Sequence, residues 1–411
     1  MMVSDVTRAA HVLNGRPAAD ERPCLVCISN TVWNESCPTN REQIMLRLSK
    51  HMRVLVVEAP ESLLGRIVGH GHPPARPAGR GLREHAHNLW LLGPSDVIPY
   101  PLTRRFSRLA DLNDWFVRLN VRWAVRRLGF RRPFLWIYAP DGGHYLKTLA
   151  ERRSIYHCVD DYEAGRAYEY PGRRASFDRE HAEEHLASHV DDIIVTSPHL
   201  EVKMRDLNPR TTLMTNVADV ELFGQAVDPG FPATLESASW SRPVIGYVGA
   251  LDSHKVDLAL LDAVAAAHPE WTFVCIGPIG IGGRTEVHDM PRRPNILYIG
   301  ERPQAELPSY VKAFDAAIIP YHLNDYTRGV FPLKFFEYLA AGKPVVSTPL
   351  PALRDYRGIA YFADDATGFG QSLKQALAER DGVAALKRSR MAQQHSWNSR
   401  TNQILDLLSV N

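Results

Sequence analysis

Residues 327–344 read TRGVFPLKFFEYLAAGKP, and the run VVST follows directly. Pro332 suits the first position of a helix, where its fixed φ is favourable and its missing N–H is not needed. Gly342 suits the position just past the last turn. The stretch therefore predicts a short helix between these two residues that leads into a buried strand.

This predicted helix carries a lysine and a glutamate on one face. Lys334 falls in the first turn, where the helix dipole disfavours a cation, so we interpret it as sharing the site with an anion held by free N–H groups. Glu337, three residues on, lies on the same face and is suited to a ribose diol. Together they fit a nucleoside diphosphate. The alternative is an exposed Lys334–Glu337 pair that contributes about 0.2–0.5 kcal/mol.

Length and composition indicate a globular protein of two domains. The chain has 411 residues, 45% hydrophobic and 23% charged, with a net charge of +2, so no global field favours nucleic acid. Residues 1–20 lack the apolar core of a signal peptide, and no apolar stretch approaches about 18 residues. We expect a disordered N-terminus over 1–20 and a cytoplasmic protein, free or peripheral on the inner face of the cell membrane.

Neither the cysteines nor the histidines have the spacing of metal ligands. Cys24 and Cys27 form a C-x-x-C inside the apolar run CLVCIS, with no second pair at zinc spacing, which indicates buried thiols. Residues 69–81, GHGHPPARPAGRG, are predicted to form a mobile loop. No metal site is expected.

Short apolar runs alternate with helical patterns in both halves, which predicts an α/β fold with parallel sheets. The expected domains are an N-terminal domain over 21–223, a linker over 224–241 and a C-terminal domain over 242–395 that carries the diphosphate-type motif and leaves the first domain to a second substrate. A last helix, from about 386 to 408, is expected to pack back toward the N-terminal domain through residues 396–411. The predicted strands lie at 24–29, 53–59, 89–93, 134–139, 154–159, 192–197, 243–249, 272–277, 296–300, 316–321 and 344–349.

Three segments in this order resemble glycosyltransferases of the GT-B fold: NVADVELF (216–223), PVIGYVGAL (243–251) and PLKFFEYLAAGKPVV (332–346). The chain looks most like bacterial enzymes of cell-surface polysaccharide assembly, including glucuronosyltransferases of xanthan-type exopolysaccharide pathways. The resemblance runs from about residue 24 to the C-terminus. It implies two Rossmann-like doubly wound domains facing a central cleft, a UDP-sugar donor, a glycan or lipid-linked oligosaccharide acceptor, and no cofactor.

The resemblance also implies a donor site. Glu337 matches the carboxylate that such enzymes place on the donor ribose, and Lys334 matches a lysine that reaches the diphosphate. Gly249 follows the first strand of the second domain, where a side chain would keep the backbone away from the diphosphate. The remaining donor candidates are Thr327 and Arg328 for the phosphates or sugar, Lys255 for a phosphate, and Glu301 and Arg302 for the nucleobase. A solvated surface lysine is the alternative for Lys255.

Two departures from the family pattern bear on mechanism. Many retaining members carry a second glutamate eight residues before the ribose glutamate, where this chain has Gly329. The arginine that often follows the Gly-rich turn is replaced by Ala250 and Leu251. These losses favour an inverting mechanism, and the lack of a suitable Asp-x-Asp motif favours a metal-independent one.

An inverting transferase needs a base to accept the acceptor's proton. The segment SIYHCVDDYEAG (154–165) ends an apolar strand in Asp160 and Asp161, and the closer relatives carry an acid there. Two adjacent acids raise one pKa by mutual repulsion. The alternative is a helix N-cap, with one acid in each role. His157 is expected to be packed rather than catalytic.

Two other strand-end loops are candidates for the acceptor site. Trp33, Asn34 and Glu35 follow the first strand, and Tyr138 and Asp141 belong to the loop at the end of the fourth. Aromatic faces beside amide and carboxylate groups suit a sugar ring. Burial of Trp33 against the next helix is the alternative.

Residues 104–132 contain nine arginines against Asp111 and Asp114. Leu109, Leu112, Phe116, Leu119 and Trp123 recur at helical spacing, which predicts an amphipathic helix. Such a helix can lie on an anionic membrane surface. The alternative is a helix packed on the core with a solvated basic face.

Two rival functions share this architecture. A non-hydrolysing nucleotide-sugar epimerase would also bind UDP, and a non-catalytic partner protein would be consistent with Gly329. A dehydrogenase is disfavoured because GPIGIGG (277–283) lacks the G-x-G-x-x-G order.

Overall fold

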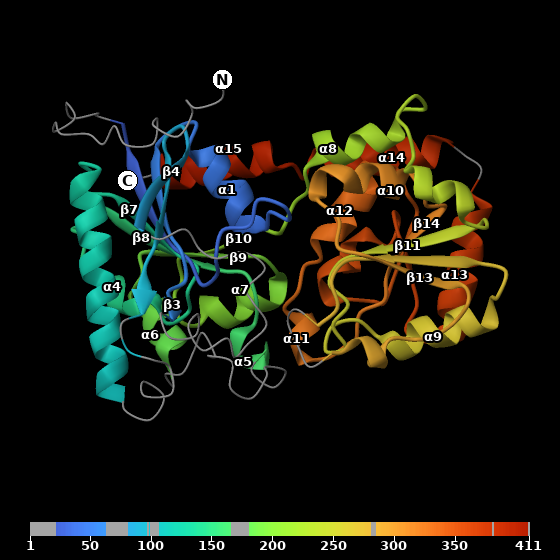
Figure 1. Ribbon diagram of the computed structural model, residues 1–411, viewed down its shortest axis with the longest axis horizontal. Helices are drawn as coiled ribbons and strands as arrows, with labels where there is room; N and C mark the ends of the chain where they lie inside the picture. The colour runs from blue at the N-terminus through green and yellow to red at the C-terminus, as the bar shows by residue number, and fades with distance from the viewer. Residues whose placement is uncertain are drawn as a thin grey trace, which may run out of the picture.

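The structure is a computed structural model that describes residues 22–62, 81–96, 98, 107–165, 181–280, 285–379 and 382–409. It consists of two α/β domains side by side (Figure 1). The expected disordered N-terminus, nearly all of the loop 69–81, and Arg104 and Arg105 lie outside the described residues.

The N-terminal domain is built on a sheet of order β10-β9-β8-β7-β1-β2-β5-β4. Every pair is parallel except β4 with β5. The strands at predicted positions are β1 (Cys24–Ile28), β2 (Arg53–Val57), β5 (Leu89–Gly93), β7 (Phe134–Ile137), β8 (Arg153–Cys158) and β9 (Asp192–Val195). They are buried on both faces, and so appear as continuous apolar runs. Two strands of this sheet were not predicted from the sequence: β4 (Gly81–Ala86), which is half-exposed, and the short β10 (Thr211–Leu213). Two further short strands, β3 (Glu61–Ser62) and β6 (Ser95–Asp96), pair with each other.

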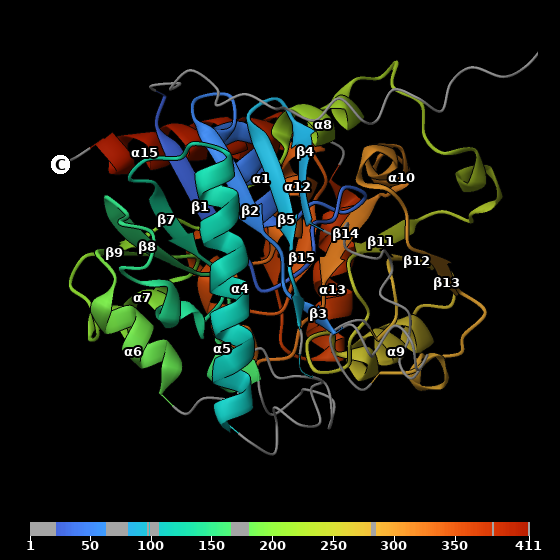
Figure 2. The same cartoon turned by 60° about the vertical axis from the view of Figure 1, so that its left-hand side comes forward.

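Helices cover both faces of this sheet. α4 (Ser107–Arg127) packs on one face through Val117 and Val121, and Figure 2 shows it standing in front of the strands. α1 (Asn40–Leu48) packs on the other face through Ile44 and Met45. The remaining helices are α5 (Tyr162–Gly165), α6 (Ala182–His189) and α7 (Pro198–Arg205).

The C-terminal domain has an all-parallel sheet of order β13-β12-β11-β14-β15-β16. Its strands are β11 (Val244–Val248), β12 (Thr272–Ile276), β13 (Ile296–Gly300), β14 (Ala316–Ile319), β15 (Val345–Ser347) and β16 (Tyr361–Phe362). Its helices are α9 (Leu258–Ala267), α10 (Leu307–Ala313), α11 (Asp325–Arg328), α12 (Leu333–Ala340), α13 (Ala366–Ala378) and α14 (Gly382–Gln393). The strand order reverses between β11 and β14, and ligands of such sheets bind at the carboxyl ends of the strands at this point.

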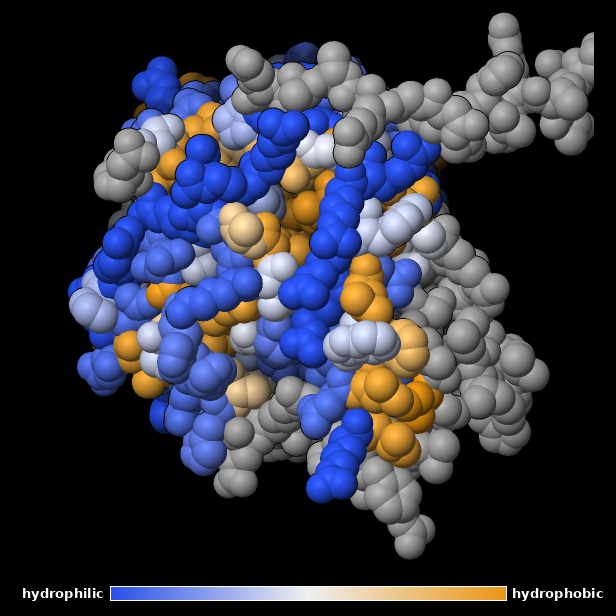
Figure 3. All heavy atoms as spheres, turned by 90° about the vertical axis from the view of Figure 1, so that its left-hand side faces the viewer, coloured by the Kyte–Doolittle hydropathy of each residue, from blue (hydrophilic) through white to orange (hydrophobic). Residues whose placement is uncertain are grey.

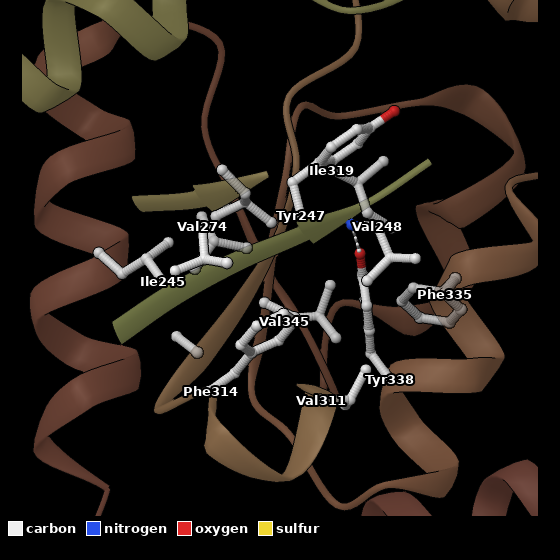
Figure 4. Packing of buried hydrophobic residues seen from close by; sticks show 14 of the residues in the cluster. Ile245, Tyr247, Val248, Val274, Val311, Phe314, Ile319, Phe335, Tyr338 and Val345 are labelled. Atoms are coloured by element: carbon white, nitrogen blue, oxygen red, sulfur yellow. Dashed lines mark hydrogen bonds between the residues drawn. The ribbon is translucent and has the colours of Figure 1, made fainter. Parts of the chain in front are cut away.

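The core of this domain holds α12 against the end of β11 (Figure 4). Tyr338 is fully buried, and its hydroxyl accepts a 2.7 Å hydrogen bond from the Val248 N–H. The Phe314 ring lies over Gly246, where a Cβ atom would stand 2.0 Å from the ring. The Tyr338 hydrogen bond joins the second half of α12 to the carboxyl end of β11, which borders the switch point.

The chain crosses between the domains twice. After the first crossing, α8 (Val220–Gly224) and two 3-10 turns, Gln225–Val227 and Leu235–Ser239, pack on the C-terminal domain, with Phe223 and Trp240 in its core. The last helical region is not one helix but two. α14 stays with the C-terminal domain, and α15 (Trp397–Ser409) returns to the N-terminal domain, where Trp397 and Ile404 are buried.

Three observations concern only the described part of the chain. No helix in it is long and apolar enough to cross a membrane. It contains no cluster of three or more His, Cys, Asp or Glu side chains arranged to hold a metal ion. Cys24 and Cys27 are buried free thiols.

Candidate functional site

The predicted helix is present as α12, shifted by one residue. Pro332 occupies the N-cap position, and the first helical residue is Leu333. Gly342 follows the last turn with φ +71, a left-handed conformation that favours glycine. The Gly342 N–H donates to the Leu339 carbonyl at 2.9 Å and so closes the helix end.

Lys334 and Glu337 form an ion pair in a mostly buried position. The Lys334 Nζ lies 2.9 Å from Glu337 Oε2, and the two side chains are 22% and 5% exposed. Burial alone lowers the pKa of Lys334, but the Glu337 carboxylate raises it above its ordinary value, so the lysine stays cationic. The pair is therefore not the exposed one of the alternative interpretation. Desolvation of the two charges offsets much of their attraction, so the burial of this pair is not explained by a gain in stability.

Lys255 also faces the region between the domains. It is half-buried, and its ammonium lies 5.6 Å from the centre of the Tyr321 ring. Its charge acts to lower the pKa of Asp160, which belongs to the other domain. Lys255 is therefore not a fully solvated lysine, and its contact with a donor phosphate stays a prediction.

Gly249 is required by local packing whether or not a ligand is bound. Its φ is +154, and a Cβ atom would lie 2.8 Å from the Tyr247 hydroxyl. A Cβ atom on Gly277, at the end of the next strand, would stand 2.1 Å from the Gly249 carbonyl oxygen. The two glycines let the carboxyl ends of β11 and β12 approach each other closely.

Asp160 and Asp161 have different environments. Asp161 accepts from Lys203 Nζ at 2.9 Å, from His199 Nε2 at 3.3 Å and from the Ala164 N–H at 3.3 Å. Although burial raises its pKa, these hydrogen bonds hold the pKa below the ordinary value. Asp161 is therefore an ionised anchor that caps α5.

Asp160 is half-buried, and its Oδ1 lies 3.5 Å from the Tyr326 hydroxyl. Burial raises its pKa to about 6, and the contribution of Asp161 is the smallest of the causes. Asp161 also raises this pKa, as the repulsion of two adjacent acids predicts, but desolvation is the larger cause. A carboxylate with a pKa near neutral is suited to act as a base.

The two domains touch at this point. A Cβ atom on Gly329 would lie 3.1 Å from the Asp161 Cβ, and one on Gly165 would lie 3.7 Å from the Tyr326 ring. A glutamate at position 329 would thus meet the Asp160–Asp161 turn. The room for a side chain at position 329 is therefore limited by the other domain, which the local sequence does not show.

Two donor candidates are corrected. Thr327 is fully buried, and its hydroxyl donates to the His322 carbonyl and accepts from the Asn324 N–H at 3.1 Å. It caps α11 and is not placed to bind a phosphate. Arg328 is exposed and forms a 2.9 Å ion pair with Asp325.

The nucleobase candidates face different partners. Arg302 donates to the Tyr310 hydroxyl at 2.7 Å and to Glu236 at 3.3 Å, so its guanidinium is turned toward the segment before β11. This arrangement does not favour a contact with a base. Glu301 accepts from the Cys37 thiol at 3.4 Å.

Cys37 is a residue that the sequence analysis did not identify. It comes from the loop after β1, and burial followed by the Glu301 hydrogen bond raises its pKa to about 11. The charge of Lys334 lowers the pKa of Cys37 and the charge of Glu337 raises it, so the thiol lies near the Lys334–Glu337 pair. No local pattern marks it, because its neighbours come from the other domain.

The proposed acceptor residues are not gathered at one surface. Trp33 is 7% exposed and Tyr138 is 2% exposed, so neither ring is available to a sugar; the alternative of burial is the correct one for Trp33. Asn34 accepts from the Ser36 and Cys37 N–H groups at 3.1 and 3.2 Å and shapes its own turn. Glu35 is exposed near His85, and Asp141 begins a 3-10 turn.

α4 has two apolar faces rather than one. Val117, Val121 and Ala124 form the buried face. The exposed face contains four large side chains, Leu112 at 41%, Trp115 at 46%, Leu119 at 39% and Trp123 at 53% exposure. Most of the predicted apolar face therefore points outward. Figure 3 looks onto this side of the molecule and shows apolar side chains gathered among strongly hydrophilic ones.

His157 is packed in the core, as expected. It is 2% exposed, stacks on Tyr138 with ring centres 4.9 Å apart, and neither ring nitrogen has a hydrogen-bond partner among the described residues. Burial, together with the charge of Arg400, lowers its pKa to about 3.

This packing predicts a pH-dependent stability. Between pH 6.5 and about 3 the unfolded chain binds a proton at His157 that the folded chain does not bind. The free energy of unfolding should therefore fall as pH decreases through this range, by about 1.4 kcal/mol per pH unit from this group. Urea unfolding measured from pH 7.5 to 4.5 should show a shallower loss for His157→Phe. An identical slope in both proteins would contradict the assignment.

The geometry can be compared with known proteins. Residues 242–379 match the family described as Glycosyl transferases group 1. The matched segment is the C-terminal domain from β11 to α13. It carries Lys255, Lys334 and Glu337, and thus the whole candidate donor site.

Relatives extend the likeness beyond the group 1 domain. The putative teichuronic acid biosynthesis glycosyltransferase TuaH of Bacillus subtilis is 29% identical over 241 residues, which cover 56% of this chain and 59% of that protein. A sucrose-phosphate synthase from Thermosynechococcus elongatus has a TM-score of 0.65 at 16% identity, covering 94% of this chain and 98% of its own. HepE of Anabaena, in complex with UDP and glucose, has a TM-score of 0.63 at 14% identity, covering 95% and 100%. The architecture is the GT-B fold.

Proposed function

We propose that this chain is an inverting, metal-independent glycosyltransferase of bacterial polysaccharide biosynthesis. Its donor is a nucleotide sugar, with a UDP-sugar favoured, and its acceptor is a glycan or a lipid-linked oligosaccharide. One observation carries the proposal. A buried Lys334–Glu337 pair at the start of α12 lies at the domain junction, and Asp160, with a pKa near 6, faces that junction from the other domain.

Each residue has a defined task in the proposed reaction. Glu337 accepts hydrogen bonds from the donor ribose, and Lys334 with the N–H groups of α12 holds the diphosphate. Asp160 takes the proton of the acceptor hydroxyl as its oxygen attacks the anomeric carbon. The bond from that carbon to the phosphate oxygen breaks, and the charge that develops on the leaving diphosphate is stabilised by Lys334. Contact of the two domains excludes water that would hydrolyse the donor.

The comparisons support the substrate classes. HepE was solved with UDP and glucose, and TuaH is named for teichuronic acid, a glycan. Both are proteins of related architecture or sequence, and a nucleotide-sugar donor and a glycan acceptor come to this chain by that analogy.

An assay for free UDP tests the proposal against its rivals. A panel of UDP-sugars is incubated with the protein, with and without an extract of bacterial lipid-linked oligosaccharide. The proposal predicts UDP release that depends on the extract. Conversion of a UDP-sugar without the extract would indicate the epimerase, and binding without any turnover would indicate a non-catalytic partner.

The exposed face of α4 supports a membrane contact in the same reaction. Leu112, Trp115, Leu119 and Trp123 are spaced along one side of the helix, and Arg108, Arg122 and Arg126 are also exposed on it. Tryptophan and arginine together favour the interface of an anionic bilayer. A lipid-linked acceptor would reach the N-terminal domain from that surface.

Substitution of this face should weaken vesicle binding. The double variant Trp115→Ala/Trp123→Ala is expected to bind vesicles of anionic phosphatidylglycerol at least about tenfold more weakly than the wild type, because two interfacial anchors are lost. Co-sedimentation measures the bound fraction. Leu235→Ala is the matched control, since Leu235 is 93% exposed but lies beside the C-terminal domain. Equal loss in both proteins, or none in either, would remove α4 as the docking face.

A further inference from the structure

The two segments that cross between the domains lie against each other. On the way out, Val217 is buried in the N-terminal core and Ala218 in the C-terminal core. On the way back, Ala392 belongs to the C-terminal core and Trp397 to the N-terminal core. The Ala218 N–H donates to the His395 carbonyl at 3.1 Å, which joins the crossings. Any opening of the domains must bend at this place.

A cavity of about 580 Å³ lies beside these crossings. Its volume falls in the range of small-molecule sites. The candidate donor and base residues do not line it. The cavity is lined by both crossing segments and by Tyr356. The first segment contributes 212–215 and Val217, and the second contributes residues between 394 and 406, including Gln394, Arg400, Gln403 and Asp406.

Arg400 brings an uncompensated positive charge to this cavity. The residue is 8% exposed, and its Nη2 donates to the Thr215 carbonyl at 2.6 Å. Within the described parts of the chain, its Nε is buried without a hydrogen-bond partner, and no carboxylate lies within ion-pair distance of the guanidinium. A buried guanidinium without a counter-ion is costly, so a site that keeps one is suited to an anion that binds from outside.

The start of α15 adds a second element that favours an anion. Ser396 caps the helix by accepting from the Ser399 N–H at 3.1 Å, and Arg400 lies in the first turn. Ser396, Ser399 and Arg400 all line the cavity, so the first turn of this 13-residue helix, which carries its positive end, borders the cavity together with the guanidinium. The charge of Arg400 also helps burial to lower the pKa of His395, so this neighbour is a neutral donor or acceptor.

We propose that this hinge cavity is a binding site for a sugar monophosphate, separate from the donor site. The phosphate is held by Arg400 and the start of α15. The hydroxyls of the sugar are matched by the amides of Gln394 and Gln403 and by the Asp406 carboxylate, which all line the cavity. A cavity of about 580 Å³ is larger than a bare phosphate needs, and its polar lining suits a polyol.

A ligand at this place would bias the angle between the domains. It would contact both crossings at once, and the Arg400–Thr215 hydrogen bond is one of the links between them. A ligand that binds one domain arrangement better than the other shifts the population toward it. The site is thus a place where a phosphorylated sugar can regulate closure. The binding inference does not depend on the proposed catalytic function.

Calorimetric titration of the full chain with glucose 1-phosphate tests the site. Wild type is compared with Arg400→Gln, Ser399→Leu and Glu337→Ala, and inorganic phosphate and glucose serve as partial ligands. We expect at least a tenfold loss of affinity for glucose 1-phosphate in Arg400→Gln and Ser399→Leu, and no change in Glu337→Ala. Inorganic phosphate should bind more weakly than glucose 1-phosphate, and glucose more weakly still.

The variants keep the inference falsifiable if one of them is unstable. Ser399→Leu keeps the Arg400 guanidinium and places a larger side chain in the cavity. If Arg400→Gln does not fold, the affinity of Ser399→Leu for glucose 1-phosphate tests the site. No binding of glucose 1-phosphate to wild type at millimolar concentration would overturn the proposal. Loss of binding in Glu337→Ala together with retention in Ser399→Leu would also overturn it, because the ligand would then occupy the donor site.

Discussion

Replacing Asp160 with asparagine should lower kcat by about 10²–10⁴-fold, the usual contribution of a positioned base, and leave the affinity for the nucleotide sugar unchanged. The carboxylate faces the domain junction and has a pKa of about 6, whereas the amide cannot accept the acceptor's proton. Turnover is followed by UDP release, and affinity by calorimetry with UDP.

The pH profile gives the same prediction a second readout. A base must be deprotonated to act, so kcat/KM of the wild type should rise as pH increases through about 6 and level off above it. The residual activity of Asp160→Asn should lack this acidic limb. An unchanged limb in the variant would assign the titration to another group.

Asp161→Asn is the matched control. Asp161 accepts hydrogen bonds from Lys203 and His199, so its loss should lower the free energy of unfolding and reduce kcat far less than Asp160→Asn. Equal losses of kcat in the two variants, both folded, would contradict the separate roles of the two acids.

The second large effect is expected at Glu337. Glu337→Ala should weaken the binding of the nucleotide sugar by about 10- to 150-fold, which corresponds to about 1.5–3 kcal/mol for hydrogen bonds to a charged group. The substitution also removes the partner of Lys334, 2.9 Å away in a mostly buried position. Calorimetry with UDP gives the dissociation constants.

Two further variants make this prediction specific. Lys334→Ala should weaken UDP more than it weakens uridine, since the lysine is assigned to the diphosphate. Glu301→Ala should leave the affinity for UDP within about twofold, because Glu301 is exposed and bonded to Cys37. If Glu301→Ala were as damaging as Glu337→Ala, the ribose assignment would fail.

Much of the fold could be predicted because its signals are local. Buried parallel strands appear as apolar runs, and α12 is bounded by Pro332 and Gly342 in a way that elementary backbone chemistry explains. β4 escaped prediction because it is a half-exposed, antiparallel edge strand of mixed polarity. The last helical region was expected to be one helix from about 386 to 408. Its division at 394–396 follows from the chain crossing between two cores.

The site could be predicted only in part, because its chemistry depends on partners distant in sequence. The donor pair is local, three residues apart on one helix turn. The difference between Asp160 and Asp161 arises from Lys203, which lies 42 residues from Asp161, and from Tyr326, which belongs to the other domain. The acceptor prediction was wrong for Trp33 and Tyr138, because a strand-end aromatic has the same local pattern whether it is exposed or buried.

A crystal structure of the full chain with bound UDP is the most direct test of the central claim. The account predicts the β-phosphate within hydrogen-bond distance of Lys334 Nζ and the N–H groups at the start of α12, with the ribose diol on the Glu337 carboxylate. UDP bound elsewhere, with Lys334 and Glu337 still paired only to each other, would contradict it.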